Sequence, residues 1–191
     1  MTTDRPDAPA RPRADARSNR RRILAAATAV FDRQGHDATL SAIAAEAGVG
    51  IGTLYRHFPD RGRLVEEVYR HRVVELCDRA ESLLTASSSP RAALGTWLEA
   101  FAAHLIANRD LPEALLPALT AGSEFRQETG RLLADAVQSF LDAGTAAGEI
   151  RDDVTPIDLL RIATGLAMVS TTVAEAAKPI EVVLDGLRPA G

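Results

Sequence analysis

The sequence predicts an all-α fold, and three observations carry that prediction. Apolar residues recur at the spacing of helical turns in successive segments, and glycine, proline or polar capping residues separate those segments. Alanine and leucine are abundant, whereas aromatic residues make up only 4 % of the chain, and this composition favours helices over sheets. The sequence contains no internal repeat and no strand pattern. We therefore expect about nine helices, and 191 residues suffice to bury a substantial core.

The N-terminal segment is expected to differ from the rest of the chain. Residues 1–18 contain three prolines and four arginines but no periodic apolar face, which predicts a disordered arm. A basic arm either adds nonspecific phosphate contacts or has no function, and both interpretations remain open. The first helix is expected from about Asn19 to Gln34, with Ile23 and Phe31 facing inward and Gly35 ending it.

Residues 39–58 have the pattern of two short helices joined by a glycine turn. Thr39 is a good N-cap, because its hydroxyl can accept a hydrogen bond from an unpaired amide at the helix start. Gly48 is expected to end the first helix in the left-handed conformation. In the second helix Leu54 and Phe58 face the core, and the polar side chains between them face outward. This layout predicts a helix-turn-helix whose second helix enters the DNA major groove.

A long helix is expected next, capped by Asp60 and running to about Thr85. At ~1.5 Å per residue it would be roughly 35 Å long. Five shorter helices complete the prediction, and a serine or threonine cap followed by proline marks some of their starts. They comprise a helix opened by Ser89 and Pro90, a short one within residues 109–122 bent by Pro117, one from Ser123 to about Ala147, one from Asp153 or Thr155 with Pro156 through Ala177, and a last one from Pro179.

Charge is distributed unevenly along the chain, whose net charge is −4. Residues 1–63 contain 11 basic and 7 acidic side chains, a net charge of +4. Residues 64–191 contain 11 basic and 19 acidic side chains, a net charge of −8. A small basic DNA reader joined to an acidic body would show this asymmetry, although charge differences between halves of a chain are common.

The segment from Arg20 to Leu64, with ILAAATAVFDRQG and then TLSAIAAEAGVGIGTLYRHFPDRGRL, resembles the TetR (tetracycline-repressor) family of bacterial transcription regulators. The resemblance covers about a quarter of the chain, and its centre, AGVGIGTLYRHF, is highly specific. It implies a three-helix DNA-binding domain over residues 19–63 and a six-helix ligand-binding and dimerisation domain over residues 64–191. The implied function is a ligand-responsive repressor that binds a palindromic, double-stranded DNA operator as a homodimer.

The candidate DNA-contacting residues lie on both helices of the motif. Major-groove entry places the N-terminal half of the second helix against base edges, so Ile51 can contact a thymine methyl and Thr53 a base or phosphate. Arg56 is able to read guanine or to clamp the backbone. The resemblance assigns phosphate contacts to three further residues of the motif and of the next helix start. The full candidate set is Thr39, Ser41, Gly50, Ile51, Gly52, Thr53, Tyr55, Arg56, His57 and Arg61.

The resemblance also implies an effector pocket for a small molecule inside the C-terminal domain. Its candidate lining residues are Trp97, Phe101, His104, Leu119, Phe125 and Met168. A stripe of this kind is equally the pattern of a plain core. His104 stands out, because a polar group on an apolar face needs a partner, which is either a ligand or an internal carboxylate or carbonyl.

The last two helices are implied to pair with their copies across a two-fold axis. The candidate interface residues are Leu159, Ile162, Leu166, Val169, Val183 and Leu187. The helix from Pro156 is apolar over most of its circumference, so it needs a second partner surface. Either a dimer or the core of a monomer supplies that surface. In the dimer, a ligand that favours a different spacing of the recognition helices would weaken operator binding through the long helix.

Several other functions are not indicated. The four histidines have no metal-ligand spacing, and no catalytic or dinucleotide motif is present, so neither an enzyme nor a cofactor is expected. The single cysteine, Cys77, cannot form an intrachain disulfide, which favours the cytoplasm. No apolar run approaches the ~18 residues of a membrane span. An enzyme is the main alternative from another class, and a helical adaptor protein that has lost DNA reading is the second, since Gly50 and Ile51 offer few base hydrogen bonds.

Overall fold

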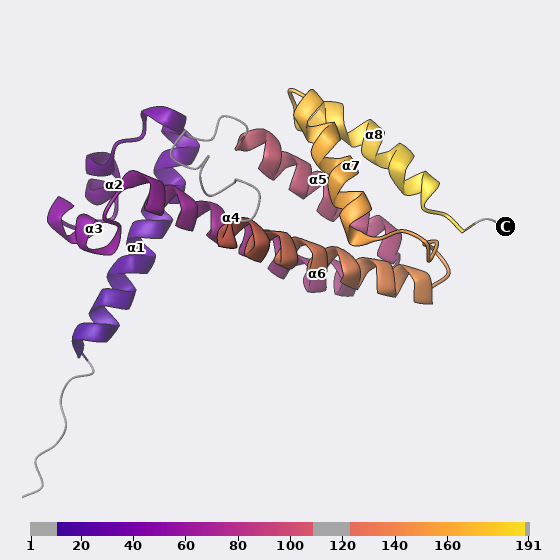
Figure 1. The fold of residues 1–191 in the computed structure, drawn as a ribbon, viewed down its shortest axis with the longest axis horizontal. Coiled ribbons are helices and arrows are strands. Elements are labelled where there is room, and N and C mark those ends of the chain that lie inside the picture. Colours follow the sequence, from indigo (N-terminus) through magenta and orange to yellow (C-terminus); the bar gives the residue numbers. More distant parts are fainter. Residues whose placement is uncertain (1–10, 109–122, 190–191) are drawn as a thin grey trace, which may run out of the picture. The chain divides into compact units, whose positions relative to one another are not determined.

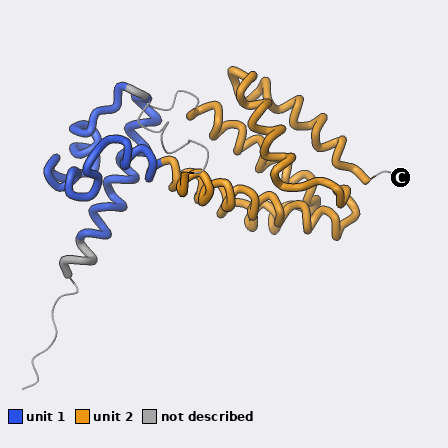
Figure 2. Tube along the Cα trace, viewed as in Figure 1, with its two compact units in different colours: residues 1–68 blue, residues 69–191 orange. Residues whose placement is uncertain are grey.

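The computed structural model describes residues 11–108 and 123–189. This part of the chain contains eight α-helices and one 3-10 turn and no strand, which confirms the all-α prediction. The short helix predicted within residues 109–122 lies outside the described residues. The chain divides into two compact units, Met1–Val68 and Tyr69–Gly191 (Figure 2).

The first unit contains α1 (Arg11–Gln34), the 3-10 turn η1 (Gly35–Asp37), α2 (Leu40–Glu46), α3 (Ile51–His57) and the beginning of α4 (Arg61–Ala86) (Figure 1). The start of α1 differs from the prediction, because residues 11–18 are helical and not part of a disordered arm. Pro12 stands in the first turn, where its missing amide costs no helical hydrogen bond, and good helix formers follow it.

The core of the first unit joins α1, α2, α3 and the start of α4. Its largest fully buried side chains include Ile23, Ile43 and Phe58. Leu64 and Val68 of α4 belong to the same cluster. The unit therefore ends at Val68 and not at residue 63, since these two α4 side chains are buried with it.

The second unit contains the rest of α4 with α5 (Pro90–Ala107), α6 (Glu124–Ala146), α7 (Pro156–Val169) and α8 (Val173–Gly186). Helix α5 packs against α6, α7 and α8. Trp97, on α5, has no exposed surface and lies within the core of the unit.

Predicted caps account for most helix starts. Ser89 and Ser123 accept hydrogen bonds from the amides of Ala92 and Arg126, both over 3.2 Å. Asp60 accepts one from the amide of Arg63 over 2.8 Å at the start of α4. Before α7, Thr155 and Asp158 form a reciprocal capping box ahead of Pro156. These starts are encoded locally, because each cap bonds an amide within its own first turn.

The division between the last two helices was predicted wrongly. Helix α7 ends at Val169 and not at Ala177, and α8 begins at Val173 with Pro179 inside it. Thr172 caps α8 by accepting a hydrogen bond from the amide of Glu175. Ile180 is buried beyond the proline, so packing keeps the helix continuous although Pro179 donates no hydrogen bond to it.

Candidate functional site

The turn between α2 and α3 has the geometry that its sequence predicted. Thr39 caps α2 by accepting a hydrogen bond from the amide of Ala42 over 3.1 Å. Gly48 has φ +62°, the left-handed conformation expected at the end of α2. Gly50 is extended and stands as the N-cap of α3, with its carbonyl accepting from Thr53 and Leu54. The backbone therefore turns sharply and presents α3 on the surface of the first unit.

Helix α3 is fixed by its inner face and open on its outer face. Leu54 and the following Phe58 are buried. On the outer face Ile51 is 42 % exposed and Tyr55 is 49 % exposed. The other candidate residues divide into exposed and half-buried ones. Exposed are Thr39, Ser41, Gly50, Gly52 and Arg56, and half-buried are Thr53, His57 and Arg61.

The two glycines at the start of α3 leave open space. A Cβ atom placed on Gly50 or Gly52 would meet no other atom within 4 Å. The packing of the protein itself therefore does not require glycine at either position. Their effect is to lower the surface next to Ile51, which allows close approach of a partner such as a base edge.

Three arginines support this surface, and two of them could not be identified from the sequence. The guanidinium of Arg20 lies 2.9 Å from the carboxylate of Glu67 and over the ring of Phe58. Arg22 donates to the carbonyl of Ala47 over 2.7 Å and so holds the turn from α1. Neither a backbone carbonyl nor a side chain far along the chain can be identified as a partner from the sequence, so these two roles could not be predicted.

Arg61, predicted as a phosphate ligand, also has an internal role. Its guanidinium donates to the carbonyl of Ala38 and lies 5.5 Å from the centre of the Phe31 ring. Arg61 therefore ties the start of α4 to the segment that precedes α2. Its contribution to a DNA contact remains a prediction.

We expect Gly48→Ala to lower the free energy of unfolding by about 1–2 kcal/mol, the cost of a left-handed conformation for a residue with a Cβ. The new Cβ would also lie 2.8 Å from Nη2 of Arg22, so the side chain that holds the turn must shift. Urea unfolding followed by circular dichroism measures the change. Gly52→Ala, inside α3 and with free space around it, serves as the control and should leave stability unchanged or higher. Equal stability of both variants would contradict this role of Gly48.

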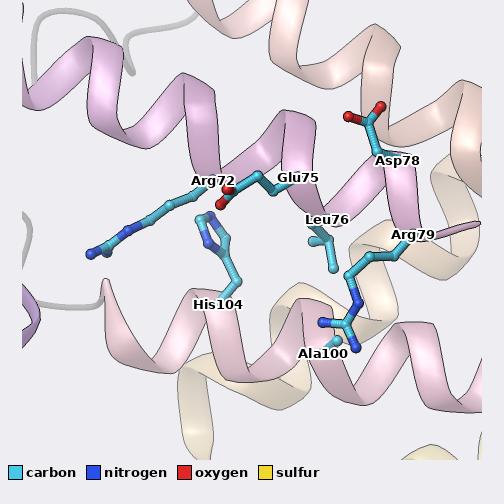
Figure 3. A pocket seen from close by; sticks show the side chains of 7 residues that line it. All are labelled: Arg72, Glu75, Leu76, Asp78, Arg79, Ala100 and His104. Carbon is cyan, nitrogen blue, oxygen red and sulfur yellow. The ribbon is translucent and has the colours of Figure 1, made fainter. Parts of the chain in front are cut away.

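The second unit contains a cavity between α4 and α5, of about 570 Å³ (Figure 3). It is lined by Arg72, Glu75, Leu76, Asp78, Arg79, Ala100 and His104. Of the residues predicted to line an effector pocket, His104 lies at this cavity. Its ring is 5.0 Å from that of Tyr69, measured between centres.

The other predicted pocket residues lie elsewhere. Trp97, Phe101 and Phe125 are buried in the packing of the unit, with Trp97 stacked on Phe101. Met168 is 75 % exposed on α7, so its assignment to an internal pocket is wrong. Leu119 lies outside the described residues. The aromatic stripe is therefore core packing, and the polar group within it marks the cavity.

Burial, together with the smaller effect of the nearby charge of Arg72, lowers the pKa of His104 from 6.5 to about 4. The folded protein thus binds this proton less well than the unfolded chain. The contribution of neutral His104 to the free energy of unfolding is fully present above pH 6.5. It is lost as the pH falls from 6.5 towards 4, by up to about 3 kcal/mol.

His104→Gln, which does not titrate, is expected to remove this dependence. The measurement is the difference in unfolding free energy between the parent and His104→Gln at several pH values, in which the contributions of other groups cancel. A difference that stays constant from pH 7 to pH 4 would show that His104 is not desolvated in the folded state.

Exposed large apolar side chains fall in two places among the described residues: α3, and the α7–α8 segment. Those in the α7–α8 segment are Ile157, Ile162, Met168, Val169, Val173 and Val182. Of the predicted interface residues, Ile162 and Val169 are therefore exposed, and Leu166 and Val183 are half-buried. Leu159 and Leu187 are buried in the core of the second unit, so they offer almost no surface to an interface.

Two further searches concern the described residues only. No group of three or more histidine, cysteine, aspartate or glutamate side chains in them is arranged to hold a metal ion. None of their helices is both long enough and apolar enough to span a membrane.

Comparison with known proteins gives matches over both units. A family model described as bacterial regulatory proteins, tetR family, matches residues 23–68. A second, described as Transcriptional regulator SbtR-like, C-terminal domain, matches residues 89–189. An HTH-type transcriptional regulator of Staphylococcus aureus is 47 % identical over 53 residues, which are 27 % of this chain and 29 % of that protein. That match thus spans less than a third of the relative.

Solved structures match over nearly the whole chain. A TetR transcriptional regulator from Streptomyces coelicolor is 40 % identical, has a TM-score of 0.74 and covers 90 % of this chain and 99 % of its own. A TetR transcription regulatory protein from Mycobacterium vanbaalenii is 30 % identical, with a TM-score of 0.69 and coverage of 93 % and 99 %. These matches and the geometry of α2 and α3 lead to one conclusion. The chain belongs to the TetR family of DNA-binding transcription regulators.

Proposed function

We propose that the protein is a ligand-responsive repressor that binds a palindromic operator as a homodimer. The observation that carries the proposal is the outer face of α3, where Ile51, Tyr55 and Arg56 are exposed while Leu54 anchors the helix from within. A methyl-bearing side chain, a phenol and a guanidinium on one short helix suit the thymine methyls, phosphates and guanine edges of a major groove.

The homodimer is supported by the exposed apolar side chains of α7 and α8. Val169 is 80 % exposed and Val182 is 63 % exposed, on a chain whose other large apolar side chains are mostly buried. Several exposed apolar side chains on two neighbouring helices mark an interaction site, and a second copy related by a two-fold axis is its simplest cover. The dimer would present two α3 helices to half-sites one DNA turn apart, roughly 34–36 Å.

Sequence discrimination is expected to rest on few base contacts. Gly50 and Gly52 carry no side chain, so Ile51, Thr53 and Arg56 remain as base readers on α3. Phosphate contacts fix position without reading sequence, so Tyr55 and His57 would set affinity. We therefore expect an operator with a few strongly preferred positions in each half-site.

The test is selection from a random duplex DNA library with the purified full chain at moderate salt. An enriched palindrome, together with a dimer mass by light scattering, is the expected result. Affinity for the enriched sequence should fall steeply with salt, because each neutralised phosphate adds about 0.9 to the slope of log K against log salt. A folded dimer that enriches no sequence would contradict operator binding and favour the adaptor alternative.

Repression and effector response need a second experiment in cells. A reporter gene placed behind the selected palindrome should be expressed less when the protein is present, because the bound dimer occludes the promoter. An effector that favours the other state of the dimer should restore expression, with a typical coupling of about 1–3 kcal/mol. Higher expression in the presence of the protein would identify an activator instead.

A further inference from the structure

The cavity between α4 and α5 contains a histidine whose tautomer is set by its neighbours. Nη1 of Arg72 donates to Oδ1 of Asn108 over 2.8 Å. A guanidinium has no acceptor, so this contact turns the amide nitrogen of Asn108 towards His104. That nitrogen donates to the backbone carbonyl of His104 over 2.6 Å and lies 3.4 Å from Nδ1. Nδ1 is therefore the accepting nitrogen, and Nε2 carries the hydrogen.

Nε2–H is a donor without an acceptor. The atom is buried and has no hydrogen-bond partner among the described residues. The ring is neutral at physiological pH, since burial and the charge of Arg72 lower its pKa to about 4. Buried donors are nearly always paired in proteins, so an unpaired one on a residue that lines a cavity is a candidate contact for a ligand.

The charges at the cavity favour an anion over a cation. Arg79 lies two turns beyond Arg72 on α4, and its side chain reaches towards Ala100 across the cavity (Figure 3). The carboxylate of Asp78 points away from the other lining side chains in the same view. Oε1 of Glu75 lies 3.3 Å from Nε2 of His71. Glu75 is thus paired with His71, Asp78 points away in this view, and the guanidinium of Arg79 reaches across the space.

The remaining wall of the cavity is apolar. Leu76 is buried and Ala100 is half-buried, and they contribute aliphatic surface between His104 and Arg79. A volume of about 570 Å³ is within the range of sites that enclose small organic molecules. A bare inorganic anion would leave this apolar surface uncovered.

We propose that this cavity binds a compact organic anion. One of its oxygens accepts the hydrogen of His104 Nε2, Arg79 supplies the counter-charge, and the apolar body of the ligand lies against Leu76 and Ala100. The inference rests on the proposed function in that this ligand is the effector. The neutral ring of His104 serves as a donor, so binding does not require its protonation.

The test is calorimetric titration of the full chain, without DNA, with octanoate, 4-phenylbutyrate and phenyl phosphate. Octan-1-ol and octylamine serve as the uncharged and cationic counterparts of octanoate. We expect at least one of the three anions to bind with a Kd of about 1 mM or below, roughly tenfold or more tightly than octan-1-ol and octylamine. Equal binding of octylamine, or no binding of any of the three anions, would overturn the proposal.

Variants then locate the site. His104→Phe keeps a planar ring and removes the donor, and Arg79→Met removes the charge from an exposed side chain. Each should weaken the bound anion roughly tenfold or more. Arg131→Met, an equally exposed arginine on α6, is the matched control and should bind as the parent does. If His104→Phe does not fold, Arg79→Met alone decides. Unchanged binding by the folded His104→Phe or by Arg79→Met would contradict the assignment.

A separate measurement distinguishes this inference from the proposed function. The anion that binds is added to the complex with the selected palindrome, and its effect on operator affinity is recorded. Release of the operator by the parent, but not by Arg79→Met, supports the anion as effector. Binding of the anion with no effect on the operator overturns the effector role. Absence of anion binding leaves the operator selection as an independent result.

Discussion

Tyr55→Ala is expected to weaken binding to the selected operator by roughly 30- to 1000-fold. The Tyr55 side chain is 49 % exposed on α3 and makes no contact that the core of the first unit needs. Loss of its hydroxyl and ring would remove a contact with the DNA phosphate backbone, worth about 1–2 kcal/mol, from each half-site. In the proposed homodimer the contact occurs twice, so the loss doubles to about 2–4 kcal/mol, and every 1.4 kcal/mol is tenfold in affinity. Fluorescence anisotropy with a labelled operator measures the effect.

Two controls separate a lost contact from a lost fold. Tyr55→Phe keeps the ring and removes the hydroxyl, so its effect should be smaller than that of Tyr55→Ala. The dimer mass and the midpoint of urea unfolding should match the parent in both variants. Parent-like affinity of Tyr55→Ala, or loss of its dimer, would count against a direct DNA contact. His57→Ala is a less clean test, because His57 is half-buried and its carbonyl accepts from Arg20.

The parts of the fold that could be predicted are those encoded within a few residues. Thr39 and Ser89 bond amides three residues ahead, and Gly48 adopts the left-handed conformation that ends a helix. Each feature needs no knowledge of the rest of the chain. The inner face of α3 follows in the same way, since burial of Leu54 at helical spacing leaves its neighbours outside.

The parts that could not be predicted depend on distant packing. Pro179 normally signals a helix boundary, but the buried side chains on either side of it keep α8 intact. Leu159 and Met168 are both large apolar residues of α7, and only the positions of the neighbouring helices decide that the first is buried and the second exposed. The helical spacing predicted that both side chains make apolar contacts, but it could not predict the partner of either one.

The same distinction between local encoding and distant packing applies to the candidate sites. The outward-facing residues of α3 could be predicted because a helix-turn-helix has a fixed outer side, and their contact with DNA stays a prediction. The cavity could not, because it depends on a contact between Arg72 and Asn108, 36 residues apart. His104 was recognisable only as a polar group in an apolar stripe. Its tautomer and its unpaired nitrogen come from side chains that the sequence does not place beside it.

Trp97→Ala is expected to lower the unfolding free energy of the second unit by about 3–5 kcal/mol, the range for removing a large buried aromatic side chain. The indole has no exposed surface and stacks on Phe101 with 5.6 Å between ring centres. Its Nε1 donates to the backbone carbonyl of Leu76 over 2.9 Å, which joins α5 to α4. Trp97→Phe would keep most of the apolar contact and lose this hydrogen bond, so about 1–2 kcal/mol is expected.

The same variant tests whether the two units have separate cores. Trp97 belongs to the cluster of the second unit, whereas Leu54 and Phe58 belong to the cluster beneath α3. Far-UV circular dichroism must follow the unfolding, because Trp97 is the one tryptophan of the chain and its fluorescence disappears with it. Glu99→Ala, on the exposed side of α5, should stay within about 0.5 kcal/mol of the parent. If the cores are separate, urea unfolding of Trp97→Ala splits into two steps, with the step of the first unit unmoved. A single step shifted as a whole would show instead that the two units unfold together.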